Sequence, residues 1–219
     1  AEQIDLYFGG EGYYDEDYFA YQKAIGEEAC KIDKLYFEDY ICENDVVVEF
    51  GSGGGYLLNI INAKEKLGIE INSAAIENAN NLGIKAVKWI DDVPNDFADV
   101  IISTHALEHV DNPLEVLQKL RNKLKDDGKI VFIVPYQSDK YEYEKNNIDN
   151  EFWNWNCLTL GNLFKRAGYF VTQVEIVYNQ YPPNFIPILQ ETGLETLKCI
   201  DKLYSNFSES ESIRMVAKK

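Results

Sequence analysis

The chain has 219 residues and a formal net charge of −16, which argues against a nucleic-acid backbone or an anionic membrane surface as its main partner. Its four cysteines form no CxxC pair and it has only two histidines, so we expect reduced thiols and no metal site. No apolar run approaches the roughly 18 residues that a membrane span needs. We therefore expect a cytoplasmic enzyme or binding protein, monomeric or homodimeric, whose partner is a small molecule.

Residues 1–44 are rich in aromatic and acidic side chains. Apolar positions from Tyr18 to Tyr40 recur at roughly helical spacing, which predicts one or two helices before the first strand. Two interpretations remain open for this segment. It is either an aromatic-anchored cap on the domain or a lid whose tyrosines, Tyr14 and Tyr18 among them, contact ligand.

Residues 45–135 alternate between strand and helix patterns. Asn112, followed by Pro113 and by Glu115 three residues on, marks a helix start with a capping box. Such alternation is typical of a parallel sheet with helices on both faces, which predicts a Rossmann-like, doubly wound α/β fold. The expected strands are 46–50, 67–71, 84–90, 98–103 and 129–134, and the expected helices are 55–66, 73–82 and one beginning at 113.

The rhythm breaks after Pro135. Residues 136–156 are polar and aromatic without clear periodicity, and we expect an insertion above the carboxyl edge of the sheet. Residues 157–219 should complete a mostly parallel, seven-stranded sheet, within one domain that spans 1–219. The elements expected there are a helix at 159–167, a strand at 169–177, a helical stretch at 185–205 and a strand at 212–217.

A glycine-rich loop follows the first expected strand and defines a nucleotide-type binding corner. Counting from Gly51 gives Gly53 and then Tyr56 at the third small position, a poor match to a dinucleotide loop. Glu49 would repel a pyrophosphate but attract an ammonium group. Glu70 follows Gly51 by nineteen residues, the spacing of a carboxylate that accepts both ribose hydroxyls. An amino-acid end, a ribose and no phosphate together describe S-adenosylmethionine.

Three segments in this order resemble the class I S-adenosylmethionine-dependent methyltransferases: Glu49–Gly55, Gly68–Asn72 and Asp99–Val110 with its "leu-glu-his-val" sequence. They are most similar to the small-molecule branch that includes sugar and natural-product O-methyltransferases, and Lys129–Pro135 looks like that branch's fifth strand. The resemblance covers residues 45–135 closely and the C-terminal strands loosely.

The resemblance implies a set of cofactor contacts. Glu49 and the glycines of the loop would line the methionine end, and Glu70 the ribose. Trp89 stands where the family often has an acidic residue for the adenine amino group. Asp91 or Asp92 could take that hydrogen bond instead, or Trp89 could only pack against adenine or in the core. The full expected set is Glu49, Gly51, Ser52, Gly53, Gly55, Glu70, Ile71, Trp89, Ile90, Asp91, Thr104 and His105.

His105 follows the fourth expected strand by two residues and is the candidate base or substrate contact, because a neutral histidine accepts a proton near pH 7. Its alternative roles are a wall of the cofactor pocket or a turn. We expect Glu108 to face solvent or to be structural. His109 could contact substrate or pack helix to sheet. The other candidate substrate contacts are the aromatic residues Tyr14, Tyr18, Tyr136, Trp153 and Trp155.

These residues predict methyl transfer from S-adenosylmethionine to a small molecule. The acceptor we favour from sequence is a hydroxyl of a sugar or of a nucleotide-linked precursor of surface polysaccharide. A small amine or a phosphoramidate-like acceptor is the nearest alternative. An NAD-dependent oxidoreductase and a non-catalytic S-adenosylmethionine-binding subunit are further alternatives, of which Tyr56 and Glu49 disfavour the first.

Overall fold

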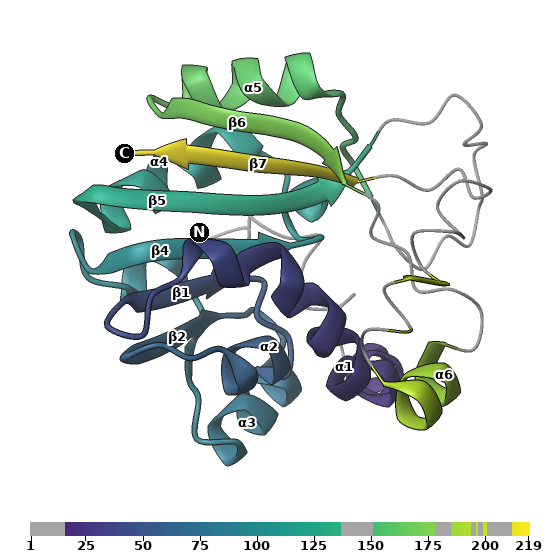
Figure 1. Ribbon diagram of the computed structural model, residues 1–219. Coiled ribbons are helices and arrows are strands. Elements are labelled where there is room, and N and C mark those ends of the chain that lie inside the picture. The colour runs from purple at the N-terminus through teal and green to yellow at the C-terminus, as the bar shows by residue number, and fades with distance from the viewer. Residues whose placement is uncertain (1–15, 137–150, 178–184, 194–195, 197–198, 201–211) are drawn as a thin grey trace.

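The computed structural model describes residues 16–136, 151–177, 185–193, 196, 199–200 and 212–219. These residues contain a seven-stranded sheet in the order β3-β2-β1-β4-β5-β7-β6 (Figure 1). Strand β7 runs antiparallel to β5 and β6, and the other pairs are parallel. The strands are β1 Val46–Phe50, β2 Glu65–Ile69, β3 Lys85–Val87, β4 Ala98–Thr104, β5 Leu124–Pro135, β6 Phe170–Val177 and β7 Ser212–Lys218.

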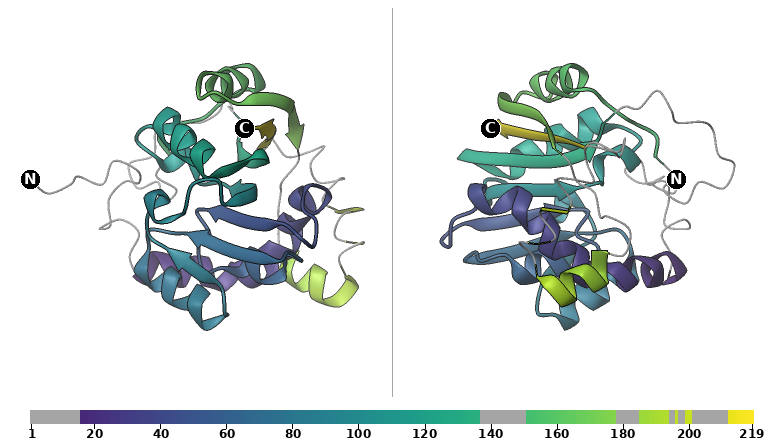
Figure 2. Two further views of the ribbon diagram at one scale, coloured as in Figure 1. Left: turned by 90° about the vertical axis from the view of Figure 1, so that its left-hand side faces the viewer. Right: turned by 45° about the vertical axis from the view of Figure 1, so that its right-hand side comes forward.

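Helices cover both faces of the sheet, as Figures 1 and 2 show. Helices α1, α2 and α3 pack on one face, and α4 and α5 on the other. This arrangement confirms the expected doubly wound α/β fold. The helices are α1 Glu16–Phe37, α2 Tyr56–Ile60, α3 Ser73–Asn81, α4 Pro113–Lys123, α5 Cys157–Arg166 and α6 Phe185–Thr192, and the 3-10 turns are η1 Glu38–Tyr40, η2 Ile90–Asp92 and η3 Leu107–His109.

The two layers follow from strand alternation, since successive side chains of a strand point to opposite faces. Val48 and Phe50 of β1 enter the core beneath α4 and α5, whereas Val47 enters the core beneath α1, α2 and α3. The ring of Phe132 on β5 stacks on Phe50 with centroids 6.2 Å apart and meets the edge of Phe164 on α5 at 5.8 Å. These three buried rings join the centre of the sheet to α5.

The N-terminal segment forms one long helix, α1, followed by the turn η1. Ala29 and Ile32 on α1 pack against Phe185 and Leu189 on α6, so these helices far apart in sequence lie side by side (Figure 1). None of the helices among the described residues is long and apolar enough to cross a membrane.

Several boundaries differ from the sequence expectation. Helix α2 ends at Ile60 rather than near residue 66, because Ile61 adopts an extended conformation and β2 begins at Glu65 in register with Val46. Strand β3 ends at Val87 rather than residue 90. The expected helical stretch 185–205 contains α6, which ends at Thr192 before Gly193 at a φ of 81°.

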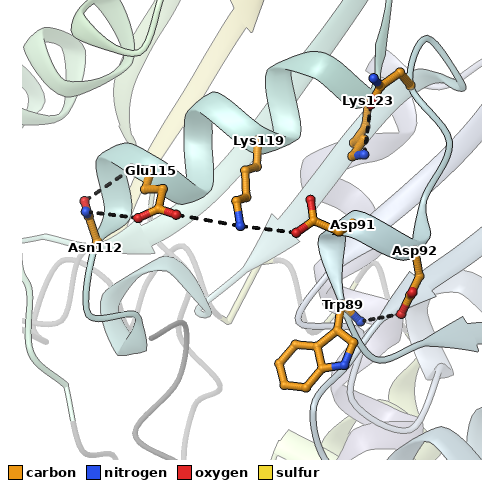
Figure 3. Close-up of polar contacts among 8 residues, drawn as sticks. Trp89, Asp91, Asp92, Asn112, Glu115, Lys119 and Lys123 are labelled. Atoms are coloured by element: carbon orange, nitrogen blue, oxygen red, sulfur yellow. Dashed lines mark hydrogen bonds and ion pairs between the residues drawn. The ribbon is translucent and has the colours of Figure 1, made fainter. Parts of the chain in front are cut away.

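The start of α4 is the predicted one, with Asn112 as its N-cap and Pro113 in its first turn. The Asn112 Oδ1 accepts the backbone N–H of Glu115 at 3.2 Å, and its Nδ2 lies 3.4 Å from a carboxylate oxygen of the same glutamate (Figure 3). The second interaction comes from the side-chain amide of Asn112 rather than from its backbone amide. The cap therefore differs in detail from the expected capping box.

The aromatic core yields a stability prediction. Phe132→Ala should lower the free energy of unfolding by about 3–5 kcal/mol, because it leaves a cavity between Phe50 and Phe164. Phe170→Ala on the edge strand β6 is the matched control, since Phe170 is 70% exposed and its loss should change that free energy by no more than about 0.5 kcal/mol. Urea titrations of both variants test this, and equal losses would contradict the packing described.

Candidate functional site

The glycine loop turns the chain from β1 into α2 at the carboxyl edge of the sheet. Gly51, Gly53 and Gly55 have φ values of 73°, 48° and 80°, a region that side chains disfavour. A Cβ on Gly51 would lie 2.4 Å from the Cβ of Ala106, which precedes η3. The Gly51 N–H donates to the carbonyl of Ile69 at the end of β2 at 2.9 Å. The loop is therefore pressed between the ends of β2 and β4, with little room for any residue but glycine at position 51.

Glu70, directly after β2, forms a hydrogen bond to the backbone of this loop. One carboxylate oxygen accepts the N–H of Gly53 and the other accepts the N–H of Asn72, each at 2.8 Å. Burial raises the pKa of Glu70, while these backbone hydrogen bonds partly oppose the increase. Glu70, the residue predicted to bind the ribose, thus lies against the glycine loop, and both of its carboxylate oxygens accept backbone N–H groups.

Glu49 on β1 is a buried acid with an unmet hydrogen-bonding capacity. Its side chain is 4% exposed, and its Oε2 has no hydrogen-bond partner among the described residues. Burial raises its pKa well above the usual range, the charges of Asp33 and Glu70 add to that, and the N–H of Leu58 opposes it. A buried carboxylate oxygen without a donor fits an ammonium group, which would supply both charge and hydrogen bonds.

Glu49 lies in the wall of a cavity of about 440 Å³ at the carboxyl edge. Four carboxyl side chains line it, and no lysine or arginine is found among its described lining residues. The cavity lining contains seven of the predicted site residues: Glu49, Gly51, Ser52, Gly53, Thr104, His105 and His109. Helix α1 contributes Ile25, Gly26, Ala29, Cys30 and Asp33, and the remaining lining residues are Gly54, Tyr56, Leu57, Glu108 and Glu151.

His105 enters this cavity from the end of β4 and is held on several sides. Its φ is 50°, uncommon for a residue with a side chain, and its N–H donates to the carbonyl of Ile133 at 2.9 Å. Its Nδ1 lies 3.1 Å from a carboxylate oxygen of Glu108, and its Nε2 lies 3.4 Å from the Oγ of Ser212. Burial lowers its pKa, but the hydrogen bond and charge of Glu108, together with the charges of Asp33 and Glu151, raise it overall.

Three acidic cavity residues were not identified from sequence. Glu108 was expected to face solvent or to be structural, and it is fully buried beside His105. Asp33 comes from α1, and Glu151 from the segment before α5. Helical spacing could have pointed to Asp33, because it follows Ala29 by four residues and therefore lies on the same side of α1. Glu108 and Glu151 had no comparable pattern.

The residues predicted for the adenine end lie outside the cavity wall. Trp89 is half-buried against the core, with Lys88 Nζ 5.4 Å from its ring centroid, and its backbone N–H donates to the carboxylate of Asp92. The carboxylate of Asp91 turns instead toward Lys119 on α4, 3.2 Å away (Figure 3). The remaining members, Gly55, Glu70, Ile71 and Ile90, also lie outside the cavity lining, and their contacts with a cofactor stay predictions.

Of the aromatic candidates for substrate contact, the described residues Tyr136, Trp153 and Trp155 are not part of the cavity lining. Trp155 is buried and pairs with Tyr136 in an isolated β-bridge. The Nε1 of Trp153 donates to the carbonyl of Val110 at 2.8 Å. Tyr14 lies outside the described residues, as does the side chain of Tyr18.

The buried acid gives a second stability prediction. Because the pKa of Glu49 is higher in the folded chain than in the unfolded chain, the free energy of unfolding falls as pH rises from the ordinary carboxyl range toward that folded pKa. Glu49→Gln removes this titration and should make the ligand-free protein more stable at pH 7. Glu77→Gln, an exposed change on α3, is the control and should alter stability by no more than about 0.5 kcal/mol. Thermal unfolding of both variants tests this, and a Glu49→Gln protein less stable than the parent would contradict it.

Many solved structures share this fold, among them the following three. A candidate methyltransferase in complex with the Haloferax volcanii Trm112 methyltransferase activator matches with a TM-score of 0.69 and 19% identity over 95% of this chain and 96% of its own. A candidate histamine N-methyltransferase from Thermotoga maritima matches at 0.65 and 16%, over 93% and 95%. Phosphoethanolamine N-methyltransferase 2 from Haemonchus contortus, solved with phosphomonomethylethanolamine and S-adenosylhomocysteine, matches at 0.62 and 12%, over 92% of this chain and 56% of its own.

No curated protein sequence matches the chain. A family model does, and it is described as the methyltransferase domain. Its match runs over residues 21–197, from within α1 past the end of α6, and so includes the glycine loop, the cavity and His105. The chain therefore belongs to the methyltransferase domain family.

Proposed function

We propose that this member of the family transfers a methyl group from S-adenosylmethionine to a small amine bound in the cavity. The observation that carries the proposal is the carboxyl-rich wall of the cavity, with Asp33, Glu49, Glu108 and Glu151 and no described lysine or arginine. S-adenosylmethionine supplies an electrophilic methyl group on a sulfonium. The chain's own residues must bind the cofactor and the acceptor, align the two, and take up the proton that the acceptor loses.

The cofactor end of the cavity is the glycine loop. Glu49 would bind the ammonium group through its Oε2, which lacks a partner among the described residues. The close turn at Gly51 would let the backbone approach the amino-acid part without a Cβ in the way. Glu70 would bind the ribose after giving up one or both of its backbone hydrogen bonds.

The charge of the remaining wall favours an amine as acceptor. Asp33 and Glu151 would attract a protonated amine and repel the diphosphate of a nucleotide-linked sugar. A neutral hydroxyl is the second candidate, supported by His105, which lies at the cavity with 38% of its side chain exposed and can accept a hydroxyl proton. With either acceptor, the Nε2 of His105 would receive the proton that the nucleophile loses.

Cofactor binding gives the first test of this function. Calorimetry with S-adenosylhomocysteine should show one site, and Glu49→Gln should weaken binding at least about tenfold, or ~1.4 kcal/mol, because the ammonium loses its charged partner. Glu77→Gln is again the control and should bind as the parent does. Failure of the parent protein to bind S-adenosylhomocysteine would overturn the proposed function.

Acceptor choice gives the second test. Radiolabelled methyl transfer should be screened with 2-phenylethylamine and histamine, with the neutral alcohol 2-phenylethanol, and with uridine diphosphate glucose. We expect label in an amine, at least about tenfold more than in the alcohol, since the acidic wall concentrates the cation. Label in the nucleotide sugar with none in either amine would contradict the amine assignment while leaving methyl transfer standing.

A further inference from the structure

Glu108 is a carboxylate that the cofactor and the acceptor, as proposed, do not need to touch. It lies in η3, fully buried between the apolar residues Leu107 and Val110. Its Oε1 is 3.1 Å from the Nδ1 of His105 and 4.0 Å from the Nε2 of His109, and its Oε2 has no hydrogen-bond partner among the described residues. Burying a carboxylate costs free energy unless a hydrogen-bond donor compensates, and the ring of His105 is positioned to be that donor.

The backbone also fixes Glu108 in place. Its carbonyl accepts the N–H of Phe152 at 2.9 Å and that of Trp153 at 3.2 Å. The same residue therefore holds His105 through its side chain and the segment that carries Glu151 through its main chain. Both of these groups line the cavity.

The position of the carboxylate determines which nitrogen of His105 can act as a base. A carboxylate accepts hydrogen bonds, so it favours the tautomer with the proton on Nδ1, and the lone pair then lies on Nε2. Nε2 is the nitrogen near Ser212, at the start of β7. Without Glu108 nothing in the described contacts of Nδ1 would select this tautomer.

Other groups face the same ring. Asp33 on α1 and Glu151 before α5 line the cavity with it, and the Nε2 of His109 lies 4.0 Å from the same oxygen of Glu108. The charges of Asp33 and Glu151 raise the pKa of His105 in addition to Glu108, whereas burial lowers it. Of these acids, Glu108 is the one with a hydrogen bond to the ring, so its removal should have an effect that removal of Glu151 does not have.

We propose that Glu108 is the positioning residue of His105, holding the ring so that Nε2 is its basic atom. The proposal rests on the proposed function for its catalytic meaning. In that reaction the acceptor nitrogen passes its proton to Nε2, the carbon–sulfur bond breaks as the carbon–nitrogen bond forms, and the sulfur keeps the electron pair. Glu108 stabilises the imidazolium that results without touching the acceptor.

The test is a nitrogen-15 NMR titration of the imidazole rings, which needs no acceptor. The chain has only two histidines, so every imidazole signal of the His109→Gln variant belongs to His105. We expect the neutral ring of His105 to carry its proton on Nδ1. In Glu108→Gln its titration midpoint should move to lower pH and a share of the other tautomer should appear, while Glu108→Asp should restore part of the effect. An Nε2-protonated ring in the parent protein, or an unmoved midpoint in Glu108→Gln, would overturn the proposal.

Glu151→Gln is the matched control, because Glu151 raises the pKa of His105 through its charge, whereas Glu108 acts through a hydrogen bond as well. It should lower the midpoint and leave the tautomer unchanged. Urea titration of each variant separates loss of folding from loss of positioning.

Kinetics then connect the positioning to catalysis. With an acceptor that the parent methylates, Glu108→Gln should lower kcat at pH 7 by about tenfold to a hundredfold, with the KM for S-adenosylmethionine unchanged. The inflection of its pH profile should follow the NMR midpoint. Parent protein that does not bind S-adenosylhomocysteine would refute the proposed function, whereas an unchanged kcat in Glu108→Gln with an active parent would refute the positioning role alone.

Discussion

The site depends on one electrostatic constraint: the carboxyl groups of Glu49 and Glu108 are both buried at the carboxyl edge of the sheet. Glu49 is the last residue but one of the buried strand β1, and Glu108 lies in η3 after β4. Each has an oxygen without a hydrogen-bond partner among the described residues. Such groups are costly in an apolar interior, so a fold that keeps them must recover that cost through binding or catalysis. A cofactor ammonium can compensate Glu49, and the ring of His105 compensates Glu108.

The sheet order explains why these two acids meet. Strands β1 and β4 are neighbours in the centre of the sheet, and the chain leaves them toward opposite sides, so a crevice opens between their carboxyl ends. The glycine loop after β1 lies at that crevice, and its Gly51 packs closely against Ala106 at the entry to η3. Helix α1 closes the crevice from the outside and adds Asp33. The glycine loop and His105 are thereby brought to one cavity by the topology of the sheet.

Local sequence patterns predicted much of this arrangement. β1 has the predicted bounds, β4 ends one residue later than predicted, and α4 begins after Asn112 as predicted. These features could be predicted because each depends on neighbours in sequence, either a run of β-branched residues or a capping side chain. The loop glycines were readable for the same reason. The burial of Glu108 was not predicted, because an acidic residue in a turn gives no local sign that the distant residues Phe152 and Trp153 will bond to its backbone carbonyl. The length of α2 was missed because pairing of Glu65 with Val46 is a tertiary contact.

The most direct test of the account is the structure of the complex with S-adenosylhomocysteine. The amino group of the ligand should lie within hydrogen-bonding distance, about 2.7–3.2 Å, of the Glu49 Oε2, with the ligand's sulfur on the His105 side of the glycine loop. The carboxylate of Glu108 should remain on the Nδ1 of His105. A ligand bound elsewhere on the molecule, or one whose carboxylate rather than amino group faced Glu49, would contradict the account.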